Sequence, residues 1–528
     1  MHNCVDNFAV PHTFAPAGAV FINYRHPPPG KVKLNNQYRI IVAVTGIVAF
    51  VACSPDSPNP VAPKVSAARD ILGATSSRNG STNGRYILSS SAGFGSNLAD
   101  QITKLGGKVE RVHTGAGFAV VSNISDANAA QLASLKGVDD VEPDIQIALN
   151  LPVPPANSTL ESTPVNTTMS QGNPALAGRF SWQWNMRLIG ADKAWAANKL
   201  GSSTVTVSIM DTGIDYDAPD LNGLVDLSRS VSFVPSDDSI TMQFFPSRNP
   251  ISDYNGHGTN VATQVSSKAV ALAGVTSMTT LIGVKVLNGQ GFGSLSGVLT
   301  GVLYSADHGA NVANMSLGGS FAKPGNRRYV NLIKRIFNYA NRKGMLVVVA
   351  AGNDAEDLDQ NGNVYEAYCD APHVICVSAV GPRVAGDDPN TPAFYTNFGR
   401  RSIDVAGPGG NADAADGFPA SNWPWGADIA SWVWSYCSKT TLVFDSTGTI
   451  LGYAGCQAGN RLTGFIGTSQ ATPHVSGLAA LLFAQYPNAA PSRIKNLIER
   501  SAIQLGNRNR DQYYGKGRIS VANALGLQ

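Results

Sequence analysis

The pattern of apolar runs after residue 181 constrains the fold of this chain more than any other feature. Short, almost unbroken apolar runs, such as MLVVVAAGN at 345–353, alternate with helical stretches such as VNLIKRIFNYANRKG at 330–344. Strands that are apolar on both faces are typical of a parallel sheet covered by helices on both sides. The pattern predicts an α/β fold with a doubly wound, mostly parallel sheet, whose functional residues gather at the carboxyl ends of the strands.

A smaller unit with a different pattern precedes this region, at residues 84–149. Its segments follow the βαββαβ order of ferredoxin-like α+β units. Ser125 or Asp126 is in place to cap the second helix. A chain of 528 residues is too long for one ordinary core, so at least two folded units are expected.

Polar stretches rich in proline separate the units. Residues 54–83 begin with SPDSPNPVAP, which cannot form a core, and we interpret them as a tether. Residues 150–180 contain LPVPPANSTLESTPVNTT and no apolar periodicity, so an exposed linker is predicted. No basic run is dense enough to suggest a nucleic-acid partner.

A secretory signal is predicted within residues 1–53. The run IIVAVTGIVAFVA at 40–52 follows basic residues between 31 and 39, and it is shorter than the roughly 20 apolar residues of a membrane-spanning helix. The ending FVAC is similar to a bacterial lipoprotein signal, which implies a lipid on Cys53. Ordinary cleavage nearby, with Cys53 incidental, is the alternative.

The cysteines also bear on the compartment. Cys369 lies close to Cys376 in sequence, and Cys437 lies close to Cys456. No Cys-x-x-Cys occurs, which argues against a zinc ribbon or a thioredoxin-type site. Two local disulfides in an oxidising compartment are the preferred interpretation, and four buried free thiols are the alternative.

Asp211 lies in SIMDTGID at 208–215, at the end of an expected strand. Asp-Thr-Gly also carries the catalytic carboxylate of pepsin-like aspartic proteases. Those enzymes need a second carboxylate in a matching motif, which this chain lacks. Their all-β fold also disagrees with the alternating pattern, so that interpretation is excluded.

Two further motifs supply a base and a nucleophile. His257 lies in NGHGTNVAT, and Ser469 lies in GTSQATPH directly before an apolar helix. Backbone N–H groups at a helix N-terminus can stabilise a developing oxyanion. The chain order Asp211, His257, Ser469 is that of the subtilisin triad.

Residues 181–528 therefore resemble the catalytic domain of subtilisin-like serine proteases (subtilases). The matching stretches, in the order of the family, are WQWNMRLIGADKAW, IMDTGID, NGHGTNVA, NMSLGGS, VVAAGN, GTSQATPHVSGLAALL and YGKGRISVANAL. The resemblance implies a serine endopeptidase that hydrolyses peptide bonds without a cofactor.

The resemblance also implies a role for each matching residue. Asp211 would orient His257, His257 would act as the base, and Ser469 would attack the scissile carbonyl. Asn353, in AAGN, would donate to the oxyanion beside the backbone N–H of Ser469. A short segment would pair with the substrate backbone as an added strand; it comprises Ser316, Leu317 and Gly318.

A ferredoxin-like unit before a subtilase domain is similar to the inhibitory prodomain of the family. VDDVEPD, at 138–144, matches how such prodomains end. The resemblance implies that residues 84–149 act as an intramolecular chaperone and inhibitor whose tail lies in the active-site cleft. The maturation site would then fall within the linker at 150–180.

The chain departs from the family pattern at several positions. Asn260 stands where a second His is common, and Gln470 stands where Met is common; neither change removes a catalytic atom. Asp220 matches a possible calcium position, but the facing loop SSKAVALAGV carries no Asn or Asp. The loop DAEDLDQNGN at 354–363 lacks the spacing of an EF-hand. Structural calcium is possible, but no metal site is predicted.

Two features suggest determinants of specificity. The Trp- and Gly-rich insertion at 410–465 is expected to border the cleft on the leaving-group side. Glu366 is a candidate for the pocket that receives the side chain before the scissile bond, where it would favour basic residues.

These inferences predict a secreted or cell-envelope serine endopeptidase made as a self-processing proenzyme. Its expected partners are protein or peptide substrates and its own prodomain, and it is expected to be a monomer. The alternatives are a processing protease with one dedicated target and a catalytically silent subtilase-fold binding protein.

Overall fold

The computed structural model describes residues 84–152, 156–157, 172–412, 430–453, 456 and 461–527. The predicted signal, Cys53 and the tether at 54–83 lie outside the described residues, as does most of the predicted linker. None of the described helices is both long and apolar enough to span a bilayer.

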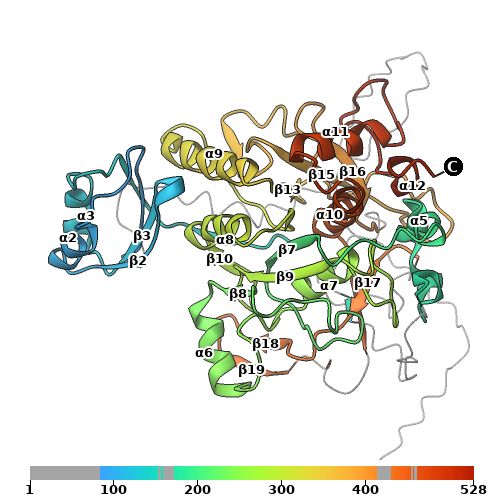
Figure 1. Ribbon diagram of the computed structural model, residues 1–528, viewed down its shortest axis with the longest axis horizontal. Coiled ribbons are helices and arrows are strands. Elements are labelled where there is room, and N and C mark those ends of the chain that lie inside the picture. Colours follow the sequence, from blue (N-terminus) through green and yellow to red (C-terminus); the bar gives the residue numbers. More distant parts are fainter. Residues whose placement is uncertain are drawn as a thin grey trace, which may run out of the picture. The chain divides into compact units, whose positions relative to one another are not determined.

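Seven parallel strands form the central sheet, in the order β16-β15-β13-β11-β7-β9-β8 (Figure 1). After β7 the chain adds β9 and β8 on one side and β11 to β16 on the other, so β7 lies beside a topological switch point, where α/β proteins place ligand sites. Every pairing is parallel, which confirms the predicted doubly wound sheet. The strands are β7 (Thr206–Asp211), β8 (Val231–Ser232), β9 (Thr280–Lys285), β11 (Val312–Met315), β13 (Leu346–Ala350), β15 (Val374–Val380) and β16 (Val405–Pro408).

Helices cover both faces of this sheet. Val207 and Ile209 of β7 pack into the core that contains α7 and α10, whereas Met210 packs into the core that contains α8 and α9. Because both faces of the sheet are buried, the sequences of its strands are almost continuously apolar. The helices of the first face are α7 (His257–Val265), α10 (Thr468–Gln485) and α11 (Pro491–Ser501), and those of the second are α8 (Leu295–Asp307) and α9 (Arg327–Arg342).

The unit at 84–149, called the front unit below, has the predicted βαββαβ order. Its four-stranded antiparallel sheet has the order β2-β3-β1-β4. Ser125, and not Asp126, caps the second helix by accepting the N–H of Asn128 at 3.3 Å. The elements are β1 (Tyr86–Ser89), α2 (Leu98–Lys104), β2 (Lys108–His113), η1 (Thr114–Ala116), β3 (Phe118–Ser122), α3 (Asp126–Leu132) and β4 (Asp140–Pro143).

The sheet of the front unit is buried on both faces. Helices α2 and α3 cover one face. Ile87, Phe118 and Val120 on the other face share an apolar cluster with α8 and α9. Tyr329 of α9 donates its hydroxyl to the carbonyl oxygen of Pro143 at 2.6 Å. The two helices therefore stand between the two sheets.

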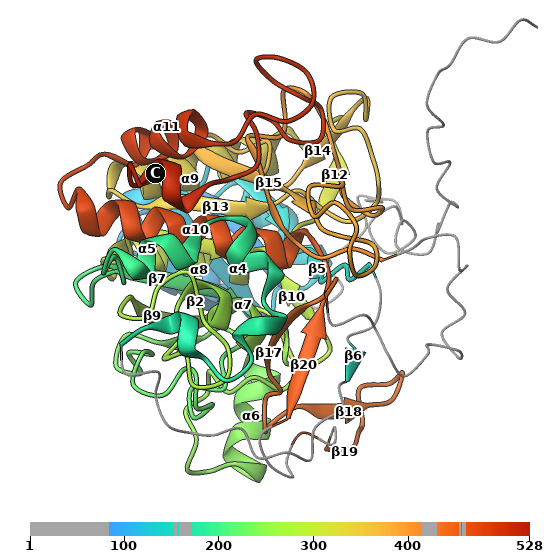
Figure 2. The same cartoon turned by 90° about the vertical axis from the view of Figure 1, so that its right-hand side faces the viewer.

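Part of the predicted insertion at 410–465 forms a small sheet. β17 (Val433–Tyr436) pairs with β20 (Leu462–Phe465), and β20 also pairs with β6 (Ala156–Asn157) (Figure 2). β20 ends shortly before α10, whose second residue is Ser469. The insertion thus supplies the middle strand of this small sheet close to the expected nucleophile.

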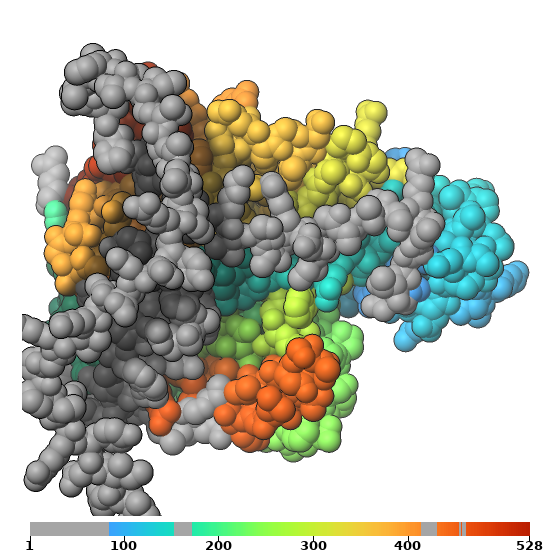
Figure 3. Space-filling view, turned by 180° about the vertical axis from the view of Figure 1, so that it is seen from behind, coloured from blue at the N-terminus to red at the C-terminus, as the bar shows by residue number. Residues whose placement is uncertain are grey.

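The rest of the described insertion is a hairpin. β18 (Leu442–Phe444) pairs with β19 (Ile450–Tyr453), and the hairpin lies beside α6 (Pro235–Phe244) on the surface (Figure 3). The rings of Tyr453 and Phe245 contact each other, with centroids 5.9 Å apart.

The structure joins Cys369 to Cys376 and Cys437 to Cys456, the two pairs that sequence proximity favoured. Their Cα atoms are 5.2 and 5.6 Å apart. Shorter elements complete the described fold: η2 (Pro174–Leu176), η3 (Phe180–Trp182), α4 (Trp184–Leu188), α5 (Ala191–Ala196), β12 (Ser320–Ala322), β14 (Val364–Glu366) and α12 (Val521–Ala524).

Candidate active site

Asp211 and His257 meet at the carboxyl edge of the central sheet. Asp211 is the last residue of β7, and His257 is the first residue of α7. Gly256 adopts a φ of 100°, and a Cβ at Gly258 would overlap the carbonyl oxygen of Gly213. These glycines let α7 begin directly beside the turn that follows β7.

The contact between Asp211 and His257 determines which nitrogen of the neutral imidazole carries the proton. Nδ1 of His257 lies 2.8 Å from Oδ1 of Asp211, and both side chains are fully buried. A carboxylate only accepts hydrogen bonds, so Nδ1 carries the proton and Nε2 carries the free lone pair. No described residue bonds to Nε2. A buried nitrogen without a partner is rare outside functional sites, and this one is set up to accept a proton.

Ser469 is the second residue of α10. Its hydroxyl donates to the carbonyl oxygen of Ser316 at 3.0 Å, and the hydroxyl of Ser316 donates to the carbonyl oxygen of Ser469 at 2.6 Å. The structure therefore brings Ser469 against Ser316, and no hydrogen bond joins Ser469 to His257 among the described contacts. Such serine–base bonds often tighten only when substrate is correctly placed.

Asn353 follows β13 and lies next to the start of α10. Its Oδ1 accepts from the N–H and the hydroxyl of Thr468, both at 2.9 Å. These two donors fix the orientation of the amide. Nδ2 then donates to the carbonyl oxygen of Asn150 at 2.6 Å.

That carbonyl belongs to the segment that follows β4, residues 145–150, which is called the tail below. β5 (Gln146–Ala148) of the tail pairs antiparallel with β10 (Phe292–Ser294). The N–H of Leu149 continues the pairing by donating to Gly291 at 2.8 Å. Residues 291–294 are not recognisable as a strand from the sequence, because a segment this short carries no periodic signal.

The predicted substrate strand at Ser316, Leu317 and Gly318 lies near the same tail. Leu317 shares a buried apolar cluster with Ile147, and a Cβ at Gly319 would lie 3.9 Å from Cγ2 of Ile147. Strand pairing between this segment and a substrate stays a prediction.

The two departures from the family pattern contact each other. Nε2 of Gln470 lies 3.3 Å from Oδ1 of Asn260, and Nδ2 of Asn260 donates to the carbonyl oxygen of Val433 at 3.1 Å. One turn further along α10, His474 accepts from Asn185 at 2.8 Å and donates to the carbonyl oxygen of Gln470 at 2.8 Å. Side chains of α7 and α10 are thus joined by a buried polar network that the sequence did not reveal.

The carboxylate of Asp220 accepts hydrogen bonds from backbone N–H groups. Its carboxylate accepts the N–H groups of Val270, Ala271 and Leu272 at 2.7 to 3.0 Å. Burial raises the pKa of Asp220 to about 7, and the three N–H donors oppose that rise. The carboxylate of Asp220 therefore holds the loop at 270–272 in place through three hydrogen bonds. Because backbone N–H groups surround the carboxylate oxygens, the site does not fit a calcium ion.

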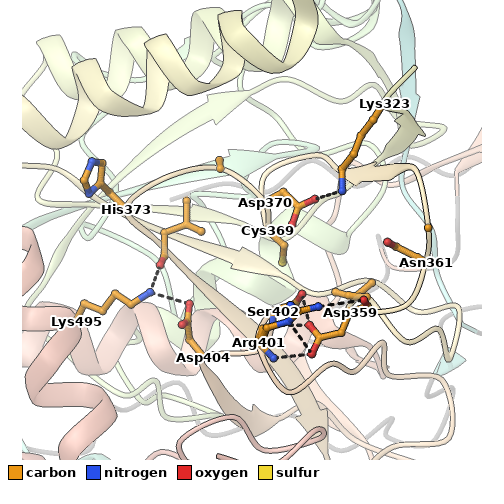
Figure 4. A pocket seen from close by; sticks show the side chains of 14 residues that line it. Lys323, Asp359, Asn361, Cys369, Asp370, His373, Arg401, Ser402, Asp404 and Lys495 are labelled. Carbon is orange, nitrogen blue, oxygen red and sulfur yellow. Dashed lines mark hydrogen bonds and ion pairs between the residues drawn. The ribbon is translucent and has the colours of Figure 1, made fainter. Parts of the chain in front are cut away.

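The loop at 354–363 also uses its oxygens within the protein. Asp359 accepts from the N–H and the hydroxyl of Ser402 at 3.1 and 2.9 Å. The loop borders a cavity of about 560 Å³ whose charges are paired, as in the 2.9 Å contact of Lys495 with Asp404 (Figure 4). Within the described residues, no three or more His, Cys, Asp or Glu side chains are grouped to hold a metal ion.

Glu366 ends β14 in an acidic environment. Its Oε1 accepts from Asn361 at 3.0 Å. Burial raises its pKa to about 7, and repulsion from Asp354, Glu356 and Asp370 adds to that rise. Carboxylates therefore concentrate on the side of the site where Asn150 lies.

Known proteins resemble this chain over most of the region after residue 181. The family model described as the subtilase family matches residues 202–517. Subtilisin DY from Bacillus licheniformis is 30% identical over 343 residues, which cover 65% of this chain and 97% of that protein. A thermophilic serine proteinase from Bacillus sp. (strain AK1) is 30% identical over 347 residues, which cover 65% and 67% of the two chains.

Solved structures share the fold. The epidermin leader peptide processing serine protease of Staphylococcus aureus has a TM-score of 0.65 at 21% identity, covering 84% of this chain and 98% of that chain. Fervidolysin from Fervidobacterium pennivorans, a keratinolytic enzyme related to subtilisin, has a TM-score of 0.59 at 22% identity, covering 85% of this chain and 61% of that chain. With the family match and the 30% identity to subtilisin DY, the chain belongs to the subtilase family of serine endopeptidases.

Proposed function

We propose that Asp211, His257 and Ser469 form a catalytic triad that hydrolyses peptide bonds through an acyl-enzyme. The observation that carries the proposal is the 2.8 Å contact between Nδ1 of His257 and Oδ1 of Asp211, which leaves Nε2 unpaired in a buried site. That arrangement supplies a base of the correct tautomer. The position of Ser469 at the start of α10, beside Ser316, supports its role as nucleophile.

In the proposed reaction, Nε2 of His257 takes the hydroxyl proton as Oγ of Ser469 attacks the scissile carbonyl. The protonated imidazole is stabilised by Asp211 and then delivers the proton to the leaving amine. Asn353 donates Nδ2 to the developing oxyanion. Its present bond to the carbonyl of Asn150, at 2.6 Å, supports this role because a peptide carbonyl already occupies the position of the acceptor.

The front unit, residues 84–149, is proposed to be an inhibitory prodomain, followed by the linker at 150–180 and the catalytic domain at 181–528. Two observations support this assignment. Its sheet packs on α8 and α9, and its tail pairs with β10 and contacts Asn353. A substrate that approaches the site would have to displace the tail, so the proenzyme would be inhibited until the unit is released.

We also propose that the protein acts outside the cytoplasm. The predicted signal at 1–53 and the two disulfides support an oxidising compartment. Attachment through a lipid on Cys53 and a monomeric state are part of the proposal.

The test compares the full-length wild type with Ser469→Ala by intact mass after incubation, together with assays on a peptide library. We expect the wild type to lose the front unit and to cleave peptides, and we expect the Ala variant to do neither. If both proteins remain intact and neither cleaves any peptide, the site is a binding surface and the proposed triad is wrong.

A further inference from the structure

Two described stretches of the chain, residues 145–152 and 156–157, form strand pairs on either side of the candidate active site. Before the site, β5 pairs with β10; beyond the site, β6 pairs with β20 (Figure 2). Between these two pairings, the carbonyl of Asn150 accepts the amide of Asn353 at 2.6 Å. A strand-paired tail that places one carbonyl on the proposed oxyanion donor has the arrangement of a bound substrate.

The side chain of Asn150 is also recognised. Its Nδ2 donates to Oδ1 of Asp354 at 2.8 Å. Asp354 directly follows Asn353, so one short loop contacts both the carbonyl and the side chain of the same residue. The loop can therefore bind the side chain of a residue and, at the same time, place the carbonyl of that residue on Asn353.

Asp354 is held in place by the buried Asn397. Oδ1 of Asn397 accepts the N–H of Asp354 at 2.9 Å, and Nδ2 of Asn397 donates to the carbonyl oxygen of Ala351 at 3.0 Å. Asn397 is only 2% exposed. The position of the carboxylate is therefore set by the fold around it, although the carboxylate itself is open to solvent.

The surroundings of Asp354 favour an N–H donor as its partner. Burial is the main cause of the raised pKa of Glu366, and repulsion from Asp354 adds to it, so the two carboxyl groups belong to one acidic region. Amide and cationic side chains can donate to the carboxylate of Asp354, whereas an apolar side chain would remove this hydrogen bond.

We propose that maturation cleaves the Asn150–Leu151 bond, and that Asp354 is a specificity-determining residue that selects an N–H donor in the side chain before the cleaved bond. The proposal rests on the proposed function of the triad and makes it specific. It places the maturation bond at the start of the predicted linker. It also defines the substrate class as peptides with amide or cationic residues at that position.

The proposed step balances as an ordinary hydrolysis. Oγ of Ser469 forms an ester with the carbonyl carbon of Asn150, and its proton passes through His257 to the nitrogen of Leu151 as the C–N bond breaks. Water then attacks the ester, which leaves a carboxylate on Asn150 and restores the hydroxyl of Ser469. No oxidant, reductant or further reactant is needed.

The first experiment determines the new N-terminus of the matured full-length protein by sequencing, within minutes of the first cleavage. We expect the sequence LPVPP, which begins at Leu151. An active protein whose first new N-terminus lies elsewhere would overturn the assigned bond but not the triad. Absence of both maturation and peptide cleavage would overturn the proposed function itself.

The second experiment measures kcat/KM on peptides QIAL-Xaa-LPVPP, in which Xaa is Asn, Lys or Leu. We expect the wild type to prefer Asn and Lys over Leu. Asp354→Ala should reduce the Asn-to-Leu ratio by roughly fivefold, which is the size expected for one hydrogen bond that solvent screens. It should retain most of the activity on the Leu peptide.

Asp387→Ala is the matched control, because Asp387 is an exposed carboxylate outside the site. It should leave the Asn-to-Leu ratio unchanged. If Asp354→Ala keeps the wild-type ratio while it still cleaves the Leu peptide, Asp354 does not select the side chain. If both variants change the Asn-to-Leu ratio equally, the change results from the lower overall negative charge of the protein. The assignment of selectivity to Asp354 is then also wrong.

Discussion

Asn353 can serve an oxyanion only if its amide nitrogen points at the carbonyl, and Thr468 decides that orientation. Both donors of Thr468 bind Oδ1, so Nδ2 is left for the substrate. Asn353→Leu should lower kcat by about 10²–10³-fold with little change in KM, because the lost bond strengthens as the carbonyl oxygen becomes an oxyanion.

Thr468→Val tests the orientation itself. It removes the hydroxyl donor but keeps the backbone N–H, so we expect a fall of about tenfold in kcat, equivalent to one hydrogen bond of about 1.4 kcal/mol. Thr472→Val, one turn along the same helix, is the control and should stay near the wild type. Wild-type kcat in Asn353→Leu would exclude Asn353 as an oxyanion donor.

His474 gives the fold a dependence on pH. Burial lowers its pKa from 6.5 to about 4, so the folded protein keeps the ring neutral. Between these values the unfolded chain binds a proton that the folded chain does not, and stability therefore falls as pH falls from 6.5 to 4. A difference of this size corresponds to a loss of about 3 kcal/mol over the window.

The measurement is the free energy of unfolding of Ser469→Ala, which avoids self-digestion, at several pH values between 4 and 8. Adding His474→Gln should flatten the slope between pH 4 and 6.5. Adding His308→Gln should leave the slope as it is, because His308 is exposed. An unchanged slope in the His474 variant would mean that other groups cause the acid sensitivity.

At the scale of elements, the packing of α7 on α10 places the proposed base beside the proposed nucleophile. Asn260 of α7 and Gln470 of α10 join the two helices at 3.3 Å in the buried interface. The sequence marked both positions as departures from the family, but it gave no reason for their co-occurrence. The structure explains the pair, because an amide at one position needs a partner at the other.

A double-mutant cycle tests this pairing. Asn260→Ala and Gln470→Ala should each destabilise the protein by about 1–3 kcal/mol, because each leaves a buried polar partner unsatisfied. The double variant should lose less than the sum, with a coupling of about 0.5–1.5 kcal/mol. Urea unfolding in the Ser469→Ala background measures all four proteins, and additive losses would contradict the pairing.

At the scale of the whole molecule, the front unit and the catalytic region share one interface along α8 and α9. Asp144 accepts the N–H of Ser296, at the start of α8, at 2.9 Å and the guanidinium of Arg85 at 3.1 Å. A carboxylate at a helix N-terminus is favourable, and here it holds the end of β4 beside the tail. Loss of this contact should weaken the proposed inhibition.

Asp144→Ala should therefore shorten the delay between cleavage of the chain and the appearance of peptidase activity. Asp100→Ala, an exposed substitution on α2, is the control and should keep the wild-type delay. The measurement follows mass and peptide hydrolysis in the same sample over time. Equal delays in both variants would show that Asp144 does not contribute to inhibition.

The sequence by itself determined the parallel sheet, the order of the front unit and the positions of Asp211, His257 and Ser469. Each of these is a local pattern: a periodicity, a cap or a motif within a few residues. The sequence could predict Ser125 as a helix cap because a capping hydrogen bond spans only three residues.

Only the tertiary structure decided the pairings between distant segments. Asn150 meets Asp354 across 204 positions, and Gln470 meets Asn260 across 210. The physical reason is that local propensities act over a few residues, whereas such contacts depend on how whole strands and helices pack. The sequence therefore located the maturation bond only to a linker of about thirty residues. The contact of Asn150 with Asn353 narrows the candidates to one bond.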